Sequence, residues 1–190
     1  MLTADEIIEK CSLIPSSVFE PEQRMWQRVI SELPDNLTIV DFGTGWGKSA
    51  ASLALVNPTN HVYTFDIGDV HINAGRNEQQ YIEEVNNFIK ETGAENFTFI
   101  KESSLIVTWD KEVDVLNIDS DHTYEGTKAE ILRWIPFVKV SGHIFFHDYE
   151  HPQAPGVKQA IDELIPSNFN LELIEVTDAG AVKCAHYIKR

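Results

Sequence analysis

The side chains best suited to chemistry in this chain lie in two short polar segments. Residues Asp119–Tyr124 read DSDHTY, and residues His147–His151 read HDYEH. Carboxylate oxygens and imidazole nitrogens bind divalent cations, and an imidazole can take up a proton near neutral pH. Each segment follows an apolar run typical of a buried strand. Because ligands bind outside the carboxyl ends of parallel strands, we expect both segments to face one cavity.

Within these segments, the candidate metal ligands are Asp119, His147 and Asp148. If no metal binds, His122 or His147 is expected to act as the general base, with His122 at the rim of the cavity. Structural roles remain open for both histidines. His122 could pack in the turn before a helix, and His147 could bond only to the backbone.

A third segment, Val40–Ser49, reads VDFGTGWGKS and predicts a strand, a tight turn and a helix. Glycines at 43, 45 and 47 allow positive φ and a close approach of a ligand to the backbone. The first turn of the following helix offers free N–H groups. Such a turn is typical of sites for nucleotide-like molecules.

The spacing of the glycines separates three possible ligands. A phosphate-binding P-loop would need its first glycine at Phe42, so that pattern is one residue short. A dinucleotide site would need a small residue where Lys48 stands. The pattern D-x-G-x-G-x-G fits at every position, with Asp41, Gly43, Gly45 and Gly47. A plain strand-to-helix turn without a ligand is the remaining alternative.

The D-x-G-x-G-x-G pattern resembles the first motif of class I S-adenosylmethionine-dependent methyltransferases. Asp66 ends the next predicted strand, about 20 residues further on, where an acid can accept hydrogen bonds from ribose hydroxyls. The resemblance implies that a polar residue after the third strand contacts adenine, and Glu102 and Ser103 are the candidates. It also implies that Asp119 serves the cofactor site as well as any metal site.

The segment IDSDHTYEGTKAEILRWIPFVKVSGHIFFHDY narrows the resemblance. It looks like the type 24 methyltransferase family, which is akin to cephalosporin hydroxylase and macrolide O-methyltransferases. In related metal-dependent enzymes, an acid after strand four and two acidic or amide residues after strand five hold magnesium. Asp119 and Asp148 match the first and last positions, whereas His147 departs from the pattern. Magnesium prefers oxygen ligands, so another divalent ion, or none, remains open.

The elements that must position these residues alternate along the chain. Strands are expected near residues 37–42, 61–65, 97–101, 113–118 and 143–146, with helices between them. A terminal hairpin near 170–188, turning at Asp178–Gly180, adds an antiparallel strand. The polar stretch 67–77, which contains His71, is expected to be irregular and to act as a lid. We therefore predict an α/β, Rossmann-like, doubly wound sheet of seven mostly parallel strands. Residues 1–36 are expected to form N-terminal helices packed on the methyltransferase domain, 37–190.

Composition limits the function further. The 190 residues carry a formal net charge of −15, which disfavours nucleic acid as a partner. Two distant cysteines fit a cytoplasmic protein and exclude a thiolate zinc cluster. No apolar run is long enough to span a membrane.

The sequence thus predicts O-methylation of a small molecule with S-adenosylmethionine as cofactor, by a chain that could form homo-oligomers. A divalent metal as a second cofactor remains open. An NAD(P)-dependent oxidoreductase and a non-catalytic ligand-binding domain are the alternatives.

Overall fold

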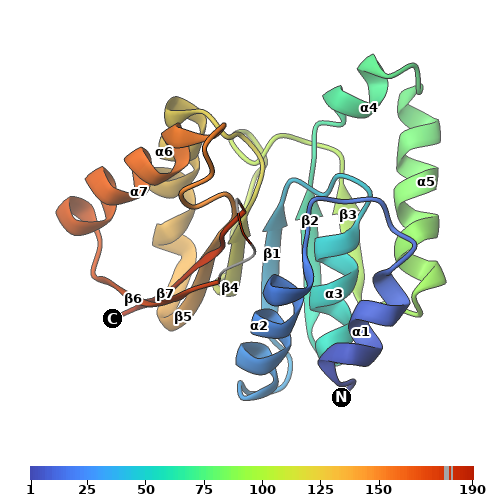
Figure 1. Cartoon of the computed structure of the whole chain (residues 1–190), viewed down its shortest axis with the longest axis horizontal. Coiled ribbons are helices and arrows are strands. Elements are labelled where there is room, and N and C mark those ends of the chain that lie inside the picture. The colour runs from blue at the N-terminus through green and yellow to red at the C-terminus, as the bar shows by residue number, and fades with distance from the viewer. Residues whose placement is uncertain (178–179, 181) are drawn as a thin grey trace.

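The computed structural model describes residues 1–177, 180 and 182–190, and it shows one sheet between two layers of helices (Figure 1). The strands are β1 (Thr38–Phe42), β2 (His61–Phe65), β3 (Phe97–Ile100), β4 (Val113–Ile118), β5 (Val138–Phe146), β6 (Leu171–Val176) and β7 (Ala185–Lys189). The helices are α1 (Ala4–Cys11), α2 (Glu20–Ser31), α3 (Lys48–Val56), α4 (Asp69–Asn73), α5 (Glu78–Glu91), α6 (Tyr124–Trp134), the 3-10 turn η1 (Ile135–Phe137) and α7 (Pro155–Asn168).

The strand order is β3-β2-β1-β4-β5-β7-β6, which confirms the predicted seven-stranded, mostly parallel sheet. The first five strands pair in parallel, and β7 pairs antiparallel with both β5 and β6. The C-terminal hairpin is therefore confirmed, and it places the reversed strand β7 inside the sheet with β6 at the edge. The predicted turn at Asp178–Gly180 falls on residues 178 and 179, which lie outside the described residues.

Alternation along the central strands divides the core into two layers. Ile39, Val115 and Phe145 pack with α1, α2, α3 and α5 on one face. Val40, Leu116 and Ile144 pack with α6 and α7 on the other face. Successive strand residues point to opposite faces, so strands buried on both sides read as nearly continuous apolar runs. The N-terminal helices α1 and α2 share the first layer.

Two elements differ from the sequence expectation. Strand β5 begins at Val138 rather than near 143, because the Ser141-Gly142 pair lies within the strand. Ser141 has φ 65°, and the β4–β5 register shifts between Val113 and Val115, so the pair forms an irregularity in the strand and not a turn. The 67–77 stretch is also not wholly irregular, since it contains the short helix α4.

None of the described helices is long and apolar enough to cross a membrane.

Candidate active site

A cavity of about 600 Å³ lies at the carboxyl ends of the parallel strands. Its walls come from the turn after β1, the segments after β2, β3 and β4, and the N-terminal connection 15–18. Parallel strands place their carboxyl ends at the same edge of a sheet, where ligands bind. The volume lies within the usual range for small-molecule and cofactor sites.

The three glycines of the turn after β1 have different surroundings, although all have positive φ. A Cβ on Gly43 would collide with the backbone carbonyl of Asp119, and one on Gly47 would lie 2.5 Å from Cγ1 of Ile89. A Cβ on Gly45 would meet no protein atom within 4 Å. Gly43 and Gly47 are therefore required by packing, and Gly45 is the position that leaves open space for a ligand. Gly43 and Gly45 line the cavity, whereas Gly47 does not.

Asp66 lies directly beside this turn. Its Oδ2 accepts a hydrogen bond from the N–H of Gly45 at 2.8 Å, and its Oδ1 accepts one from the N–H of Gly68 at 2.6 Å. The two backbone donors fix the orientation of the carboxylate at the cavity wall. Each carboxylate oxygen keeps a further lone pair for a ligand hydroxyl.

Asp41, by contrast, does not line the cavity. Its side chain is fully buried and accepts hydrogen bonds from Ser49 Oγ, Thr64 Oγ1 and Asn117 Nδ2 at 2.8–2.9 Å. Burial raises the pKa of its carboxyl to about 7, against the three hydrogen bonds that favour the charged form. Asp41, which the sequence predicted to bind the cofactor, thus connects β1 to β2, β4 and the start of α3 through hydrogen bonds.

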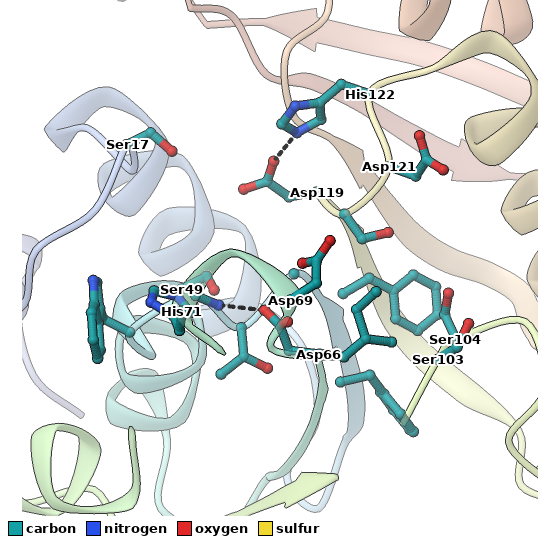
Figure 2. Close-up of a pocket in the computed structure, with 18 of the residues that line it drawn as sticks. Ser17, Ser49, Asp66, Asp69, His71, Ser103, Ser104, Asp119, Asp121 and His122 are labelled. Atoms are coloured by element: carbon teal, nitrogen blue, oxygen red, sulfur yellow. Dashed lines mark hydrogen bonds and ion pairs between the residues drawn. The ribbon is translucent and has the colours of Figure 1, made fainter. Parts of the chain in front are cut away.

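Ser103, predicted near the base of a nucleoside, lines the cavity beside Glu102, Ser104 and Leu105. Figure 2 shows Ser103 and Ser104 on one side of Asp66, with His71 on the other.

His71, in the 67–77 stretch, is only partly exposed to solvent. Its ring is stacked on the ring of Tyr81, with ring centroids 4.7 Å apart, and its centroid lies 4.1 Å from that of the Trp46 ring. The hydroxyl of Tyr81 donates to the carbonyl of Gly45 at 2.9 Å. This aromatic group attaches α4 to the glycine turn and closes one side of the cavity.

The acidic cluster lies at the ends of β4 and β5. Asp119, His122 and Asp148 offer ligand atoms that all lie within 4.8 Å of one another, an arrangement that could hold a metal ion. The Nε2 of His122 lies 3.3 Å from Oδ1 of Asp119 and 3.2 Å from Oδ2 of Asp148, and the His122 ring points toward Asp119 (Figure 2). The hydrogen bond with Asp119 raises the pKa of His122, whose side chain is half exposed.

His147 lies behind this cluster. Asp119 and His122 line the cavity, whereas His147 and Asp148 do not, so only the first of the two polar segments faces the cavity as expected. Its Nδ1 is 3.0 Å from Oδ1 of Asp119 and 3.4 Å from Oδ1 of Asp148, while its Nε2 is 3.1 Å from Oε1 of Glu22 on α2. Burial lowers the pKa of His147, but the three carboxylates outweigh burial and raise it well above its usual value. The contacts have ion-pair distances without hydrogen-bond angles. His147 is thus a buried cation between acids. On the cavity side of Asp119 and Asp148, the imidazole is that of His122, where the sequence predicted His147.

Glu22 was not among the candidate site residues predicted from the sequence. Its side chain is fully buried, and its Oε2 accepts a hydrogen bond from the N–H of Phe19 at 2.9 Å. A signal was present, because Glu22 precedes Met25, Trp26 and Val29 by three, four and seven residues. That spacing places Glu22 on the buried stripe of the helix.

Comparison with known proteins agrees with this geometry. The sequence model of a methyltransferase domain family, Methyltransf_24, matches residues 40–149, which include the glycine turn, Asp66, the first polar segment and the His147–Tyr149 part of the second. None of the curated proteins matches the chain.

Solved structures resemble the chain at low sequence identity. An O-methyltransferase from Bacillus cereus in complex with SAH is 13% identical, with a TM-score of 0.71 over 98% of this chain and 90% of that one. A Staphylococcus aureus protein with a provisional assignment as a caffeoyl-CoA O-methyltransferase is 18% identical, with a TM-score of 0.71 over 100% and 93%. An rRNA methylase from Streptococcus thermophilus is 18% identical, with a TM-score of 0.65 over 92% and 99%.

At these identities the structural neighbours show the fold, whereas the family match covers more than half of the chain and includes the candidate site. The chain therefore belongs to the Methyltransf_24 family and is an S-adenosylmethionine-dependent methyltransferase.

Proposed function

We propose that this methyltransferase transfers its methyl group to a hydroxyl oxygen of a small organic molecule. The observation that carries the proposal is the convergence of Asp119, His122 and Asp148 within 4.8 Å of one another, with Asp119 and His122 in the lining of the cavity. A hydroxyl must lose its proton to become a good methyl acceptor, and this group of side chains can supply the means. A sulfonium methyl is already activated, so the rest of catalysis is alignment, which contributes up to about 7–11 kcal/mol in favourable intramolecular reactions.

The charge of the cavity supports a small-molecule acceptor. Among the described residues that line it, the acids Asp66, Asp69, Glu102, Asp119, Asp121 and Glu130 are present, and Lys and Arg are absent. Recognition of nucleic acid depends on Lys and Arg at the phosphates. The similarity to an rRNA methylase is therefore no argument for a nucleic-acid acceptor in this protein. A neutral or cationic acceptor fits the acidic lining of the cavity better.

The cofactor fits the other part of the cavity. The open space at Gly45 admits a ligand against the backbone, and Asp66, held by Gly45 and Gly68, is placed to accept hydrogen bonds from two ribose hydroxyls. The sulfonium end then points toward Asp119. A negative wall suits a positively charged sulfonium.

We further propose that Asp119, His122 and Asp148 hold a divalent ion. Two carboxylates and one imidazole form a mixed oxygen and nitrogen donor set, which suits Mn²⁺, Fe²⁺ or Zn²⁺ better than Mg²⁺. A bound ion would lower the pKa of the acceptor hydroxyl. His147, charged and bracketed by Glu22, positions the two carboxylates from behind.

The test is methyl transfer itself. The purified chain, S-adenosylmethionine and a panel of catechols, sugars and amino alcohols would be screened for S-adenosylhomocysteine formation, before and after treatment with EDTA. Turnover with a hydroxylated acceptor supports the proposal, and its loss on chelation with recovery on adding metal supports the ion. Turnover unaffected by EDTA would assign proton removal to His122. Turnover with an RNA acceptor and with none of the small molecules would overturn the small-molecule assignment.

A further inference from the structure

Glu130 is a buried acid that no step of the proposed reaction uses. It lies on α6 with only 1% of its surface exposed, between Thr127 and Trp134 on the buried face of the helix. It nevertheless lines the cavity. A carboxyl at such a position needs partners, because an unpaired buried polar group is costly.

One oxygen of Glu130 has partners and the other does not. Oε1 accepts a hydrogen bond from Ser104 Oγ at 2.5 Å and another from Ser120 Oγ. Oε2 is screened from solvent and has no hydrogen-bond partner among the described residues. The neighbouring Arg133 does not supply one in the contacts described, since its guanidinium donates to the backbone carbonyls of Ser104 and Val107. A native buried group left in this way marks a place where a ligand or water completes the bonding.

The chemistry of the free oxygen follows from its surroundings. Burial is the largest cause that raises the pKa of the Glu130 carboxyl; together with the negative charges of Asp121 and Asp119, and against the two serine hydrogen bonds, it brings the pKa to about 7. Near neutral pH a large fraction of the carboxyl is therefore protonated. Because Oε1 accepts two hydrogen bonds, the proton belongs on Oε2. Oε2 is then a hydrogen-bond donor without an acceptor.

The position of Glu130 identifies which part of the cofactor it meets. Asp66 is placed at the ribose, and the acidic cluster of Asp119 marks the methyl end. In S-adenosylmethionine the sulfonium leaves the ribose at C5′ and the base leaves it at C1′, so the base lies on the side of Asp66 away from the sulfonium. Ser103 and Ser104 form that side (Figure 2), and Glu130 is bonded to Ser104.

We propose that Glu130 recognises the purine base of the cofactor, with Oε2 donating a hydrogen bond to a purine ring nitrogen. This inference rests on the proposed placement of S-adenosylmethionine in the cavity. Adenine offers N1, N3 and N7 as acceptors, and a carboxyl that donates would favour adenine over a base that carries a ring N–H at the same place. The serines would hold the carboxyl in position, since Ser104 follows β3 and Ser120 follows β4.

The test uses binding of S-adenosylhomocysteine, measured by calorimetry, with analogues in which N1, N3 or N7 is replaced by carbon. We expect the wild-type chain to bind one analogue about 3- to 10-fold more weakly than the parent, as expected for one neutral hydrogen bond. Glu130→Met should weaken the parent by a similar factor and should bind that analogue and the parent equally. Glu130→Gln should stay within about 3-fold of wild type, because its amide N–H₂ can donate from the place of Oε2.

The outcomes separate this inference from the proposed function. If the wild type binds S-adenosylhomocysteine but Glu130→Met still prefers the parent ligand over the analogue by the same factor, then Oε2 bonds to a water and the role of Glu130 at the purine is overturned. If all three analogues bind the wild type as well as the parent does, the role is also overturned. If the wild type binds no adenosyl ligand, the placement of the cofactor fails first. Thermal unfolding of Glu130→Met and Glu130→Gln verifies that both variants are folded. If Glu130→Met does not fold, Glu130→Gln still tests whether a hydrogen-bond donor at the position of Oε2 is sufficient for binding.

Discussion

Substitution of the glycines in the turn after β1 separates ligand space from packing. Gly45→Ala adds a methyl group where no protein atom lies within 4 Å, at φ +52°. Gly75→Ala is the matched control, because Gly75 also has positive φ, at +95°, with open space around its Cβ, and it does not line the cavity. Gly43→Ala adds the methyl group against the backbone carbonyl of Asp119.

The structure gives different magnitudes for the three changes. A non-glycine residue in the left-handed region costs about 1–2 kcal/mol, so Gly45→Ala and Gly75→Ala should each lower the free energy of unfolding by about that amount. Gly43→Ala adds overpacking against a backbone that cannot rotate away, since Asp119 C would also lie 2.7 Å from the new carbon. Overpacking typically adds about 1–3 kcal/mol, and the loss should reach roughly 2–5 kcal/mol.

Urea unfolding with and without S-adenosylhomocysteine measures both effects. A ligand at one hundred times its Kd stabilises the folded state by about 2.7 kcal/mol. Gly75→Ala should keep this increment. Gly45→Ala should reduce it by about 1.4 kcal/mol or more at the same concentration, if the added methyl group weakens binding at least tenfold. An undiminished increment in Gly45→Ala would refute the assignment of this open space to the cofactor. A Gly43→Ala variant as stable as Gly75→Ala would refute the packing argument.

Three further perturbations test the rest of the site. Asp66→Ala should weaken S-adenosylhomocysteine binding by about 1–3 kcal/mol in calorimetry, because it removes the acceptor for the ribose hydroxyls; unchanged affinity would exclude Asp66 from the site. Asp148→Ala should abolish metal-dependent turnover and metal binding, with the exposed Asp110→Ala as the carboxylate control; retained metal affinity in Asp148→Ala would contradict the ligand set. The folded-state pKa of Asp41, about 7, is above its ordinary value of 3.8. The folded state therefore binds more protons between these values, and the Asp41 contribution to stability is present below pH 4 and lost as the pH rises toward 7. Asp41→Asn should remove that part of the pH dependence of urea unfolding, and identical pH profiles would contradict a raised pKa.

The seven-stranded, mostly parallel sheet could be predicted from the sequence because its physical basis is local and repeated. Apolar runs of strand length alternate with amphipathic helices, and short connections then favour right-handed crossovers in a parallel sheet. Strand limits were less predictable where a local signal was ambiguous. Ser141-Gly142 has the composition of a turn, yet β5 continues through it because pairing with β4 absorbs the irregularity.

Within the glycine turn, the motif predicted the turn and its position at the edge of the sheet better than the role of each residue. Pattern matching treats Asp41, Gly43, Gly45 and Gly47 as one unit. Only three-dimensional packing shows that Asp41 bonds buried hydroxyls and an amide, and that Gly43 lies against the segment after β4. Such contacts join residues as far apart as Gly43 and Asp119, and spacing along the chain contains no information on them.

The acidic cluster shows the same limit. The sequence placed Asp119, His122, His147 and Asp148 at the ends of adjacent strands, and the structure brings all four together. It could not show which histidine faces the cavity. Asp148 adopts a left-handed backbone conformation, with φ 55°. That conformation is uncommon for a residue other than glycine and is often found at functional sites. His147 remains buried behind the carboxylates, and His122 reaches the open corner from the segment after β4.

His147 balances part of the negative charge of the acidic cluster. Its ring nitrogens lie within 3.4 Å of carboxylate oxygens of Glu22, Asp119 and Asp148. Even with His122 protonated as well, two positive charges against three negative charges leave the cluster net negative. A further cation, whether a divalent ion or the sulfonium of the cofactor, is therefore attracted to the open side, where His122 lies. Since Glu22 belongs to α2, the N-terminal helices contribute to this electrostatic balance as well as to the core.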